Sequence, residues 1–426
     1  MERPQQRSAG ALARALTRRI GEELAAHETS VRVPELSPAD GEIDTAMLDR
    51  AVAQALSRST RIQEERAAAP ACLAELLALS PLDRETAVIV EPRYQTYTLA
   101  AYTLERSWKA VFHDPVLARE LARLARAIVL QADPRSCGGS AALSDLEAYA
   151  LAMQGNAQRV AGELRESLVS FTQARQVQEK GGADPDLAGR IDVLEASLRR
   201  DLRQFDAAHS LLDRSAATFR ALGDRKQETY AIINRANVFV VQRDLQRAVS
   251  ALKKALSLVE DPWLDLCVRH NLISALAECG QAREASDLYD QSRSLYLQFS
   301  DPLTSCRRLW AEGLIAREIG EDLDSARTLL SEATERLAEQ GYGFDAALAG
   351  LDLVAVYAKQ GKTDAVLGVA SDLIRLFQMH NVQPEALAAL RIVQDAAERR
   401  TLDLTVLAQV AELVRANQVS RSSSAD

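Results

Sequence analysis

Apolar residues recur every three or four positions through most of the chain, which is the spacing of one buried face of an α-helix. Short breakers separate these stretches, and many contain an acidic residue or serine before proline: Ser80-Pro81, Glu91-Pro92, Asp114-Pro115, Asp133-Pro134, Asp261-Pro262 and Asp301-Pro302. Aspartate caps the free amides of a helix start, and proline fits the first turn. The nearest candidate strand, Ala87–Val90, is too short and isolated. The pattern predicts an all-α protein.

A second, longer period lies over the helical one. A small residue, a larger residue four positions on and a further residue after three more recur at Ser167-Phe171-Ala174, Ala208-Leu212-Ser215, Ala248-Leu252-Ala255, Ala285-Tyr289-Ser292, Ala326-Leu330-Ala333 and, more weakly, Val366-Ala370-Leu373. The sequence numbers of successive first positions differ by 41, 40, 37, 41 and 40. Small residues let two helices approach closely, while the larger one fills the gap to the next pair. Six helix pairs in phase are therefore predicted.

The segment from Gly155 to Ala174 closely resembles the middle of a tetratricopeptide (TPR) motif. The turns within pairs agree with it, because each offers a helix C-cap: Ala161-Gly162-Glu163, Gln242-Arg243-Asp244, Cys279-Gly280-Gln281, Ile319-Gly320-Glu321 and Gln360-Gly361-Lys362. The resemblance implies a right-handed α-solenoid of antiparallel helix pairs. TPR units usually span about 34 residues, so we expect longer helices here. Units of this length resemble the sensor halves of some bacterial regulators, such as quorum-sensing peptide receptors.

The chain is expected to divide into five parts. They are an N-terminal helical region at 1–69, flanking helices and a first helix pair at 70–143, six TPR-like repeats at 144–380, a capping helix pair at 381–419 and a disordered tail at 420–426. Amphipathic helices are predicted at about 11–26 and 45–65 in the first part. That part shows no helix-turn-helix, since it lacks two short helices joined by a tight glycine turn. Its role stays open.

Composition narrows the function classes. Apolar residues make up 47% of the chain and charged residues 26%, and the net charge is −9. An acidic chain does not suit backbone-driven nucleic-acid binding, so no direct nucleic-acid partner is expected. Charged residues interrupt the apolar positions near the N-terminus, which argues against a signal peptide or a membrane span. The five cysteines include no C-x-x-C pair, which favours a reducing compartment. We expect a cytoplasmic protein with no membrane partner.

Motifs for chemistry are lacking. The five histidines fall in different segments, and no phosphate-binding loop, dinucleotide fingerprint, G-x-S-x-G or helical zinc-protease motif occurs. Neighbouring carboxylates such as Glu163 and Glu166 fit a solvated helix face. We therefore expect no catalytic residue, no metal, no cofactor and no enzymatic activity.

In TPR arrays the first helix of each pair lines a concave groove. The resemblance, applied position by position, implies that the partner-binding residues are Tyr149, Asn156, Arg159, Arg200, Tyr230, Asn237, His270, Arg307 and Trp310. Asparagine can bond both ends of a peptide group, and arginine can bind a carboxylate with two parallel bonds. Two alternatives stay open: the asparagines could bond neighbouring helices, and the tryptophan could belong to the core. The set does not reproduce the Lys-Asn-Lys-Arg clamp of chaperone-binding TPR domains.

Two functions follow from this interpretation. The first is a non-enzymatic scaffold that binds a protein or peptide in the groove. The alternative is a regulatory protein in which a peptide or small ligand alters an output. The sequence leaves open the identity of the partner and the oligomeric state.

Overall fold

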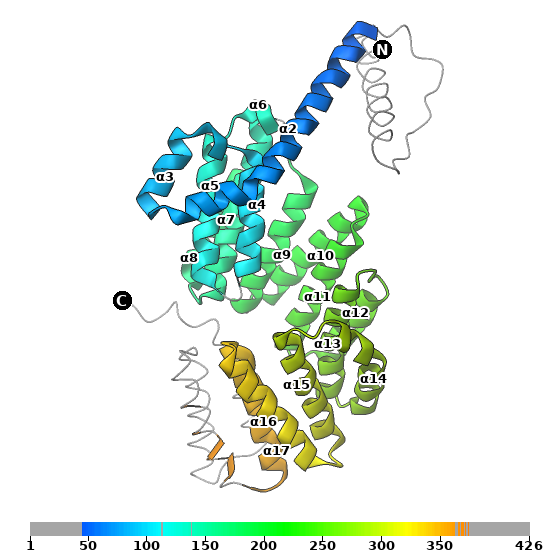
Figure 1. The fold of residues 1–426 in the computed structure, drawn as a ribbon. Coiled ribbons are helices and arrows are strands. Elements are labelled where there is room, and N and C mark those ends of the chain that lie inside the picture. The colour runs from blue at the N-terminus through cyan, green and yellow to red at the C-terminus, as the bar shows by residue number, and fades with distance from the viewer. Residues whose placement is uncertain are drawn as a thin grey trace, which may run out of the picture. The chain divides into compact units, whose positions relative to one another are not determined.

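The computed structural model of the protein describes residues 45–362 except 112–113 and 138, and in addition residues 365–366, 368–369, 371 and 374. Every regular element in this described part is a helix (Figure 1). The chain forms two compact units, Met1–Arg106 with Leu124–Leu143, and Ser107–Arg123 with Ser144–Asp426. No described helix combines the length and the apolarity that a bilayer span requires.

The first unit contains α2 (Thr45–Ala78), α3 (Pro81–Val90), a 3-10 turn (Pro92–Tyr94), the start of α4 (Tyr97–Ala110), the end of α5 (Pro115–Gln131) and α6 (Pro134–Cys137). The side chain of Ser80 accepts a hydrogen bond from the amide of Asp83 and so caps α3. Tyr94 is buried, and its hydroxyl donates to Glu75 on α2 at 2.8 Å. These contacts fasten the 3-10 turn to α2.

The helix predicted for residues 45–65 is longer than expected. It continues through Pro70 to Ala78. A proline inside a helix removes one backbone bond. The second half persists because Ala69, Leu73 and Leu76 are buried in the first unit. The residues of the candidate strand, Ala87–Val90, form the end of α3.

The second unit is built from helix pairs. They are α7 (Ser140–Val160) with α8 (Leu164–Gln178), α9 (Pro185–Asp201) with α10 (Phe205–Leu222), α11 (Arg225–Val241) with α12 (Leu245–Leu256), α13 (Pro262–Glu278) with α14 (Ala282–Gln298), and α15 (Pro302–Ile319) with α16 (Leu323–Glu339), followed by α17 (Gly343–Lys359). Each helix packs on the next one along the chain from α8 onward, as Figure 1 shows. The predicted lengthening of the helices is confirmed, since most span 17 or 18 residues.

The repeated pattern of small and large residues is the packing surface within and between pairs. In the first five units all of its members are buried, from Ser167, Phe171 and Ala174 to Ala326, Leu330 and Ala333. A close approach explains the small residue at Gly313: a Cβ there would lie 2.7 Å from Cγ of Leu330 on the paired helix. The last two positions of the sixth unit, residues 370 and 373, lie outside the described residues and stay predictions.

The turn within each pair ends the first helix of that pair. The middle residue of the turn has a positive φ at Gly162, Arg203, Arg243, Gly280 and Gly361. Such a residue lets a following amide bond a carbonyl five residues back, as from Gln281 to Leu276 at 2.9 Å. The predicted C-caps are thus present in the turns at 161–163, 242–244, 279–281 and 360–362, and Gly320, which also has a positive φ, is the C-cap of α15 in the turn at 319–321. The two arginines adopt a conformation that glycine favours.

The first helices of the pairs form a layer of their own. Contacts join α9 to α11, α11 to α13, α13 to α15 and α15 to α17. The second helices pack behind this layer, each between two of its members. The predicted all-α, right-handed solenoid of antiparallel TPR-like helix pairs is confirmed. The predicted helix at 11–26, the terminal pair at 385–399 and 402–417 and the tail at 420–426 lie outside the described residues.

Candidate binding face

The candidate site lies on the solvent side of α7, α9, α11, α13, α15 and α17, which we call the A face. Half-buried side chains form a first row across it, one from each helix in turn: Tyr149, Arg190, Tyr230, Cys267, Arg307 and Asp345. A second row lies nearer the C-terminal ends of the helices and contains Asn156, Arg159, Arg200, Asp201, Asn237 and Arg317. The two rows differ in how fully their polar groups are paired.

One end of the second row is a closed ionic cluster between α7 and α9. Arg159 donates to Asp201 at 2.8 Å and, with two other nitrogens, to the side-chain oxygen of Asn156 at 3.1 and 3.0 Å. Arg200 pairs with the other oxygen of Asp201 at 2.6 Å. Burial raises the pKa of Asp201, but the two arginines outweigh burial and hold the pKa below its ordinary value. The structure therefore brings Asn156, Arg159 and Arg200 together, with Arg159 only 9% exposed.

The other end of the second row joins α15 to α17. The indole of Trp310 donates to Asp352 at 2.8 Å, and the ring packs against a buried cluster that includes Leu330 and Leu353. Arg317 is buried and pairs with the same Asp352. These contacts tie two successive helices of the A face to one another. Trp310 does not meet the ionic cluster between α7 and α9.

Asn237 lies between these two ends, on α11. Its side chain is half-buried, and among the described residues it has no hydrogen-bond partner. Its neighbour Asn234 instead donates to the carbonyl of Tyr230, one turn earlier on the same helix. The donors and the acceptor of Asn237 are therefore not used by the described part of the protein.

The first row begins with a paired arginine. Arg190 binds both oxygens of Asp186, one turn earlier on α9, at 2.8 and 3.2 Å. Burial raises the pKa of Tyr149, and the charge of nearby Arg190 opposes this in part. Burial also raises the pKa of Tyr230, which packs against the apolar core beneath it.

Neutral groups surround the central part of the first row. Nδ1 of His270 lies 2.9 Å from the hydroxyl of Tyr296. Burial lowers the pKa of His270 to about 3, assisted by the charge of Arg307, so the imidazole is neutral at pH 7. Burial raises the pKa of Cys267 to about 11, which keeps its thiol protonated. A wall of uncharged hydrogen-bonding groups results.

Arg307 is a half-exposed cation next to this wall. Its side chain is 39% exposed and lies 3.6 Å from a carboxylate oxygen of Asp345 on α17. Burial raises the pKa of Asp345, and Arg307 opposes this shift. Of the predicted residues, His270 and Arg307 are therefore brought into one electrostatic cluster, while Asn237 forms no described hydrogen bond with any of the others.

Sequence reasoning missed several members of these groups, namely Asp201, Cys267, Tyr296 and Asp345. A signal existed for part of the first row. In each of the first four helix pairs, the same number of residues separates the first-row residue from the first small residue of the second helix. Tyr149 and Ser167 are one example, and Cys267 and Ala285 are another. Asp345 falls outside this frame, and the partners Tyr296 and Asp201 could not be paired without the packing of neighbouring helices.

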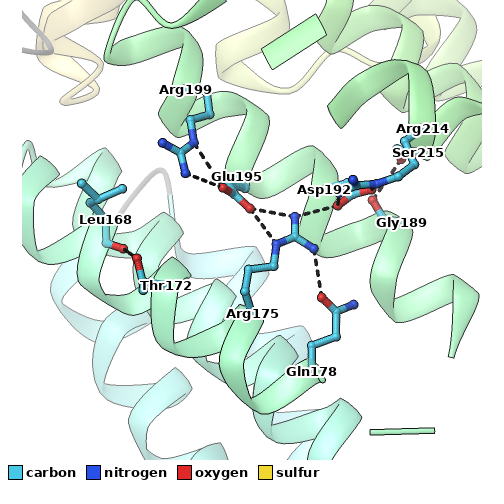
Figure 2. A network of polar contacts seen from close by, with 10 residues as sticks. All are labelled: Leu168, Thr172, Arg175, Gln178, Gly189, Asp192, Glu195, Arg199, Arg214 and Ser215. Carbon is cyan, nitrogen blue, oxygen red and sulfur yellow. Dashed lines mark hydrogen bonds and ion pairs between the residues drawn. The ribbon is translucent and has the colours of Figure 1, made fainter. Parts of the chain in front are cut away.

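A further polar network lies where the second helix of the first pair meets the second pair (Figure 2). Arg175 on α8 donates to Glu195 at 2.8 Å and to Asp192 at 2.6 Å, both on α9. Arg214 on α10 binds both oxygens of Asp192, and Arg199 binds Glu195. We call these residues the charged joint. Its two carboxylates are buried, unlike the solvated carboxylates expected on these helices.

Metal ligands do not gather within the described residues, where no group of three or more His, Cys, Asp and Glu side chains could hold an ion. The described cysteines are all free.

Comparisons with known proteins identify the fold. No protein-family model matches the chain, and no curated protein sequence matches it. Among solved structures, it is similar to a Rap protein complexed with competence and sporulation factor, with 14% identity and a TM-score of 0.55 over 75% of this chain and 87% of that one. It is also similar to aspartyl phosphate phosphatase F from Bacillus subtilis, with 12% identity and a TM-score of 0.52 over 89% and 96%. At this identity the likeness supports a helical-repeat architecture.

The second match corrects one expectation. We expected no enzymatic activity, but a protein of the same fold is named as an aspartyl phosphate phosphatase. The expectation rested on the lack of sequence motifs such as G-x-S-x-G, which belongs to a strand-to-helix turn in a different fold. Their lack excludes enzymes of those folds and says nothing about a phosphatase built from helix pairs.

Proposed function

We propose that the second unit binds a peptide, or an extended segment of a protein partner, on the A face between α11 and α17. The observation that carries the proposal is the combination of an unpartnered amide, Asn237, with a half-exposed cation, Arg307, beside a wall of neutral groups. A peptide offers backbone groups for the amide and charged groups for the cation.

The remaining predicted residues divide by their contacts. We assign Tyr230 and His270 to the wall of this site. Arg159 and Trp310 join neighbouring helices through Asp201 and Asp352, whereas Asn156 and Arg200 bind Arg159 and Asp201 within their own helices. Tyr149 lies in the first row on α7, outside the proposed segment.

The fold likeness adds support of a second kind. A protein of similar architecture has been solved with competence and sporulation factor bound. The long repeats also resemble the sensor halves of bacterial regulators, so we include a ligand-responsive regulatory role in the proposal. In such a role, binding would change the packing between repeats.

The test uses the whole chain and a library of short random peptides with free ends. We expect wild-type protein to select a related set of sequences, and Asn237→Ala to bind them about 5- to 10-fold more weakly, the effect of one lost hydrogen bond. Gln291→Ala, on the exposed side of α14, is the matched control and should bind normally. Equal binding by both variants would place the site elsewhere.

The selected peptides also decide between a scaffold and a regulator. If binding regulates an output, amide hydrogen exchange in the charged joint should change when the peptide is added. Unchanged exchange throughout the second unit except at the contact residues would indicate a rigid scaffold.

A further inference from the structure

Arg307 is the shared electrostatic neighbour of groups on three other helices. Its charge acts on Cys267 and His270 of α13, on Tyr296 of α14 and on Asp345 of α17. The first three are uncharged at pH 7, because burial disfavours their ionised forms. Among the described residues, Asp345 is therefore the one negatively charged group that pairs with this guanidinium.

Asp345 is too distant to accept a close hydrogen bond from Arg307. The nearest approach between Arg307 and Asp345 is 3.6 Å, longer than the 2.7–2.9 Å typical of a charged hydrogen bond. Arg317, further along the same helix, shows the contrast. It is 10% exposed and pairs closely with both Glu318 and Asp352. Arg307 has five N–H donors and, among the described residues, this one long ion pair.

The surroundings also suit a ligand. Trp263 is 40% exposed and lies one turn before Cys267 on α13, with its ring edge against Phe299 at a centroid distance of 5.3 Å. An apolar surface and a cation with free donors thus occur on neighbouring helices of the A face. A site of this kind recognises an anion attached to an apolar group.

Resting on the proposed function, we propose that Arg307 binds a carboxylate of the peptide through two parallel hydrogen bonds. The carboxylate has two sources, the C-terminus of the peptide or an aspartate or glutamate side chain. Arg307 would then select anionic peptides, although the protein itself carries a net charge of −9. The neutral wall matters here, since a charged histidine or a thiolate would either compete with Arg307 or repel the ligand.

The experiment is a double-mutant cycle on the short peptides that wild-type protein selects. Each peptide is made with a free carboxyl end, with an amidated end, and with each Asp or Glu replaced by Asn or Gln. Dissociation constants are measured for wild type, Arg307→Gln and the control Arg293→Gln. Arg293 lies on α14, is 67% exposed and pairs with Asp290 one turn earlier.

We expect neutralisation of one carboxylate to weaken binding to wild type by about 10- to 100-fold, as for a lost charge-assisted pair. The same neutralisation should have almost no effect on Arg307→Gln. The peptide that shows this coupling identifies the source of the carboxylate. Coupling with the amidated peptide indicates the C-terminus, and coupling with an Asn or Gln peptide indicates a side chain. Arg293→Gln should behave as wild type throughout.

Two results would overturn the inference, and they differ. Peptides could be selected, and yet Arg307→Gln and each neutralised carboxylate could change the dissociation constant independently, so that their fold-changes multiply. In that case the proposed function stands and the role of Arg307 is wrong. If no peptide is selected, the proposed function fails, and the inference with it. Should Arg307→Gln melt at a lower temperature than wild type, Arg307→Lys serves instead, since it keeps the charge, loses the paired bonds and should show a smaller coupling.

Discussion

Two junctions between repeats are stabilised by different kinds of contact. The charged joint connects α8 with α9 and α10 through Arg175, Asp192 and Arg214. From α11 to α15, in contrast, one continuous cluster of buried residues fills the space between helices, from Ile232 to Ile315, and its members are aliphatic residues and tyrosines. Both junctions join the same type of helix pair.

The two kinds of contact differ in how strictly they require a defined geometry and in how strongly they respond to salt. Ion pairs require defined geometry and respond to salt, whereas apolar packing depends on shape and buried area and hardly responds to salt. The charged joint therefore constrains how one pair meets the next, while the apolar junction contributes buried apolar area. The proposed binding segment lies over the apolar junction, where the packed core holds the residues of the first row in position.

The largest expected effect is in the apolar junction. Leu276 is fully buried on α13, and Leu276→Ala should lower the free energy of unfolding by about 2–5 kcal/mol, because a cavity remains. Urea unfolding in 0.05 and 0.5 M NaCl checks this, and the loss should be the same in both. Leu297→Ala, at a leucine 74% exposed on α14, is the control and should change the free energy by less than about 0.5 kcal/mol. Equal losses for the two variants would contradict the assigned core.

The charged joint should give a smaller effect that depends on salt. Asp192 is 3% exposed and accepts from two arginines, so Asp192→Asn should reduce local stability by about 1.5–3 kcal/mol at low salt. Amide hydrogen exchange in α9 measures this. In 0.5 M NaCl the difference from wild type should shrink, since Arg214 is largely exposed and its attraction is screened.

A matched change at the surface tests the assignment of the charged joint. Asp290→Asn removes an exposed ion pair with Arg293, and it should leave exchange unchanged. A difference for Asp192→Asn that stays the same at both salt concentrations would indicate a packing role rather than an ionic one.

The apolar junction should also respond to mild acid. His270 is held neutral in the folded chain, with a pKa of about 3, while an unfolded histidine has a pKa near 6.5. The unfolded state therefore binds more protons between these values. The contribution of His270 is complete above about pH 6.5 and is lost as the pH falls toward 3, by up to about 1.4 kcal/mol per pH unit.

His270→Gln isolates this contribution, since glutamine can still bond Tyr296 but does not titrate. Urea unfolding between pH 7 and pH 4 should show a shallower loss of stability for the variant than for wild type. Parallel pH profiles would mean that the imidazole has the same pKa in the folded and unfolded states.

Local sequence patterns were sufficient for much of the architecture. The small-large-small pattern marks the second helices because close packing of helices leaves few residue types that fit. Aspartate before proline marks helix starts, and Asp261 and Asp301 both cap as predicted, because capping involves neighbours only three residues away. The long period of the repeat likewise set the length of the helices.

The polar sites depend on contacts between residues far apart in sequence. Asn156 and Asn237 occupy the same position of the repeat, yet one lies in a saturated ionic cluster and the other has no described partner. The difference comes from Arg159 and Asp201, which lie 42 residues apart and meet only when α7 and α9 pack. Sequence alone thus determined the buried small and large positions of the second helices and the starts of the helices that aspartate caps. Only the tertiary structure decided which polar groups are already paired, because ion pairing depends on the position of both partners in space.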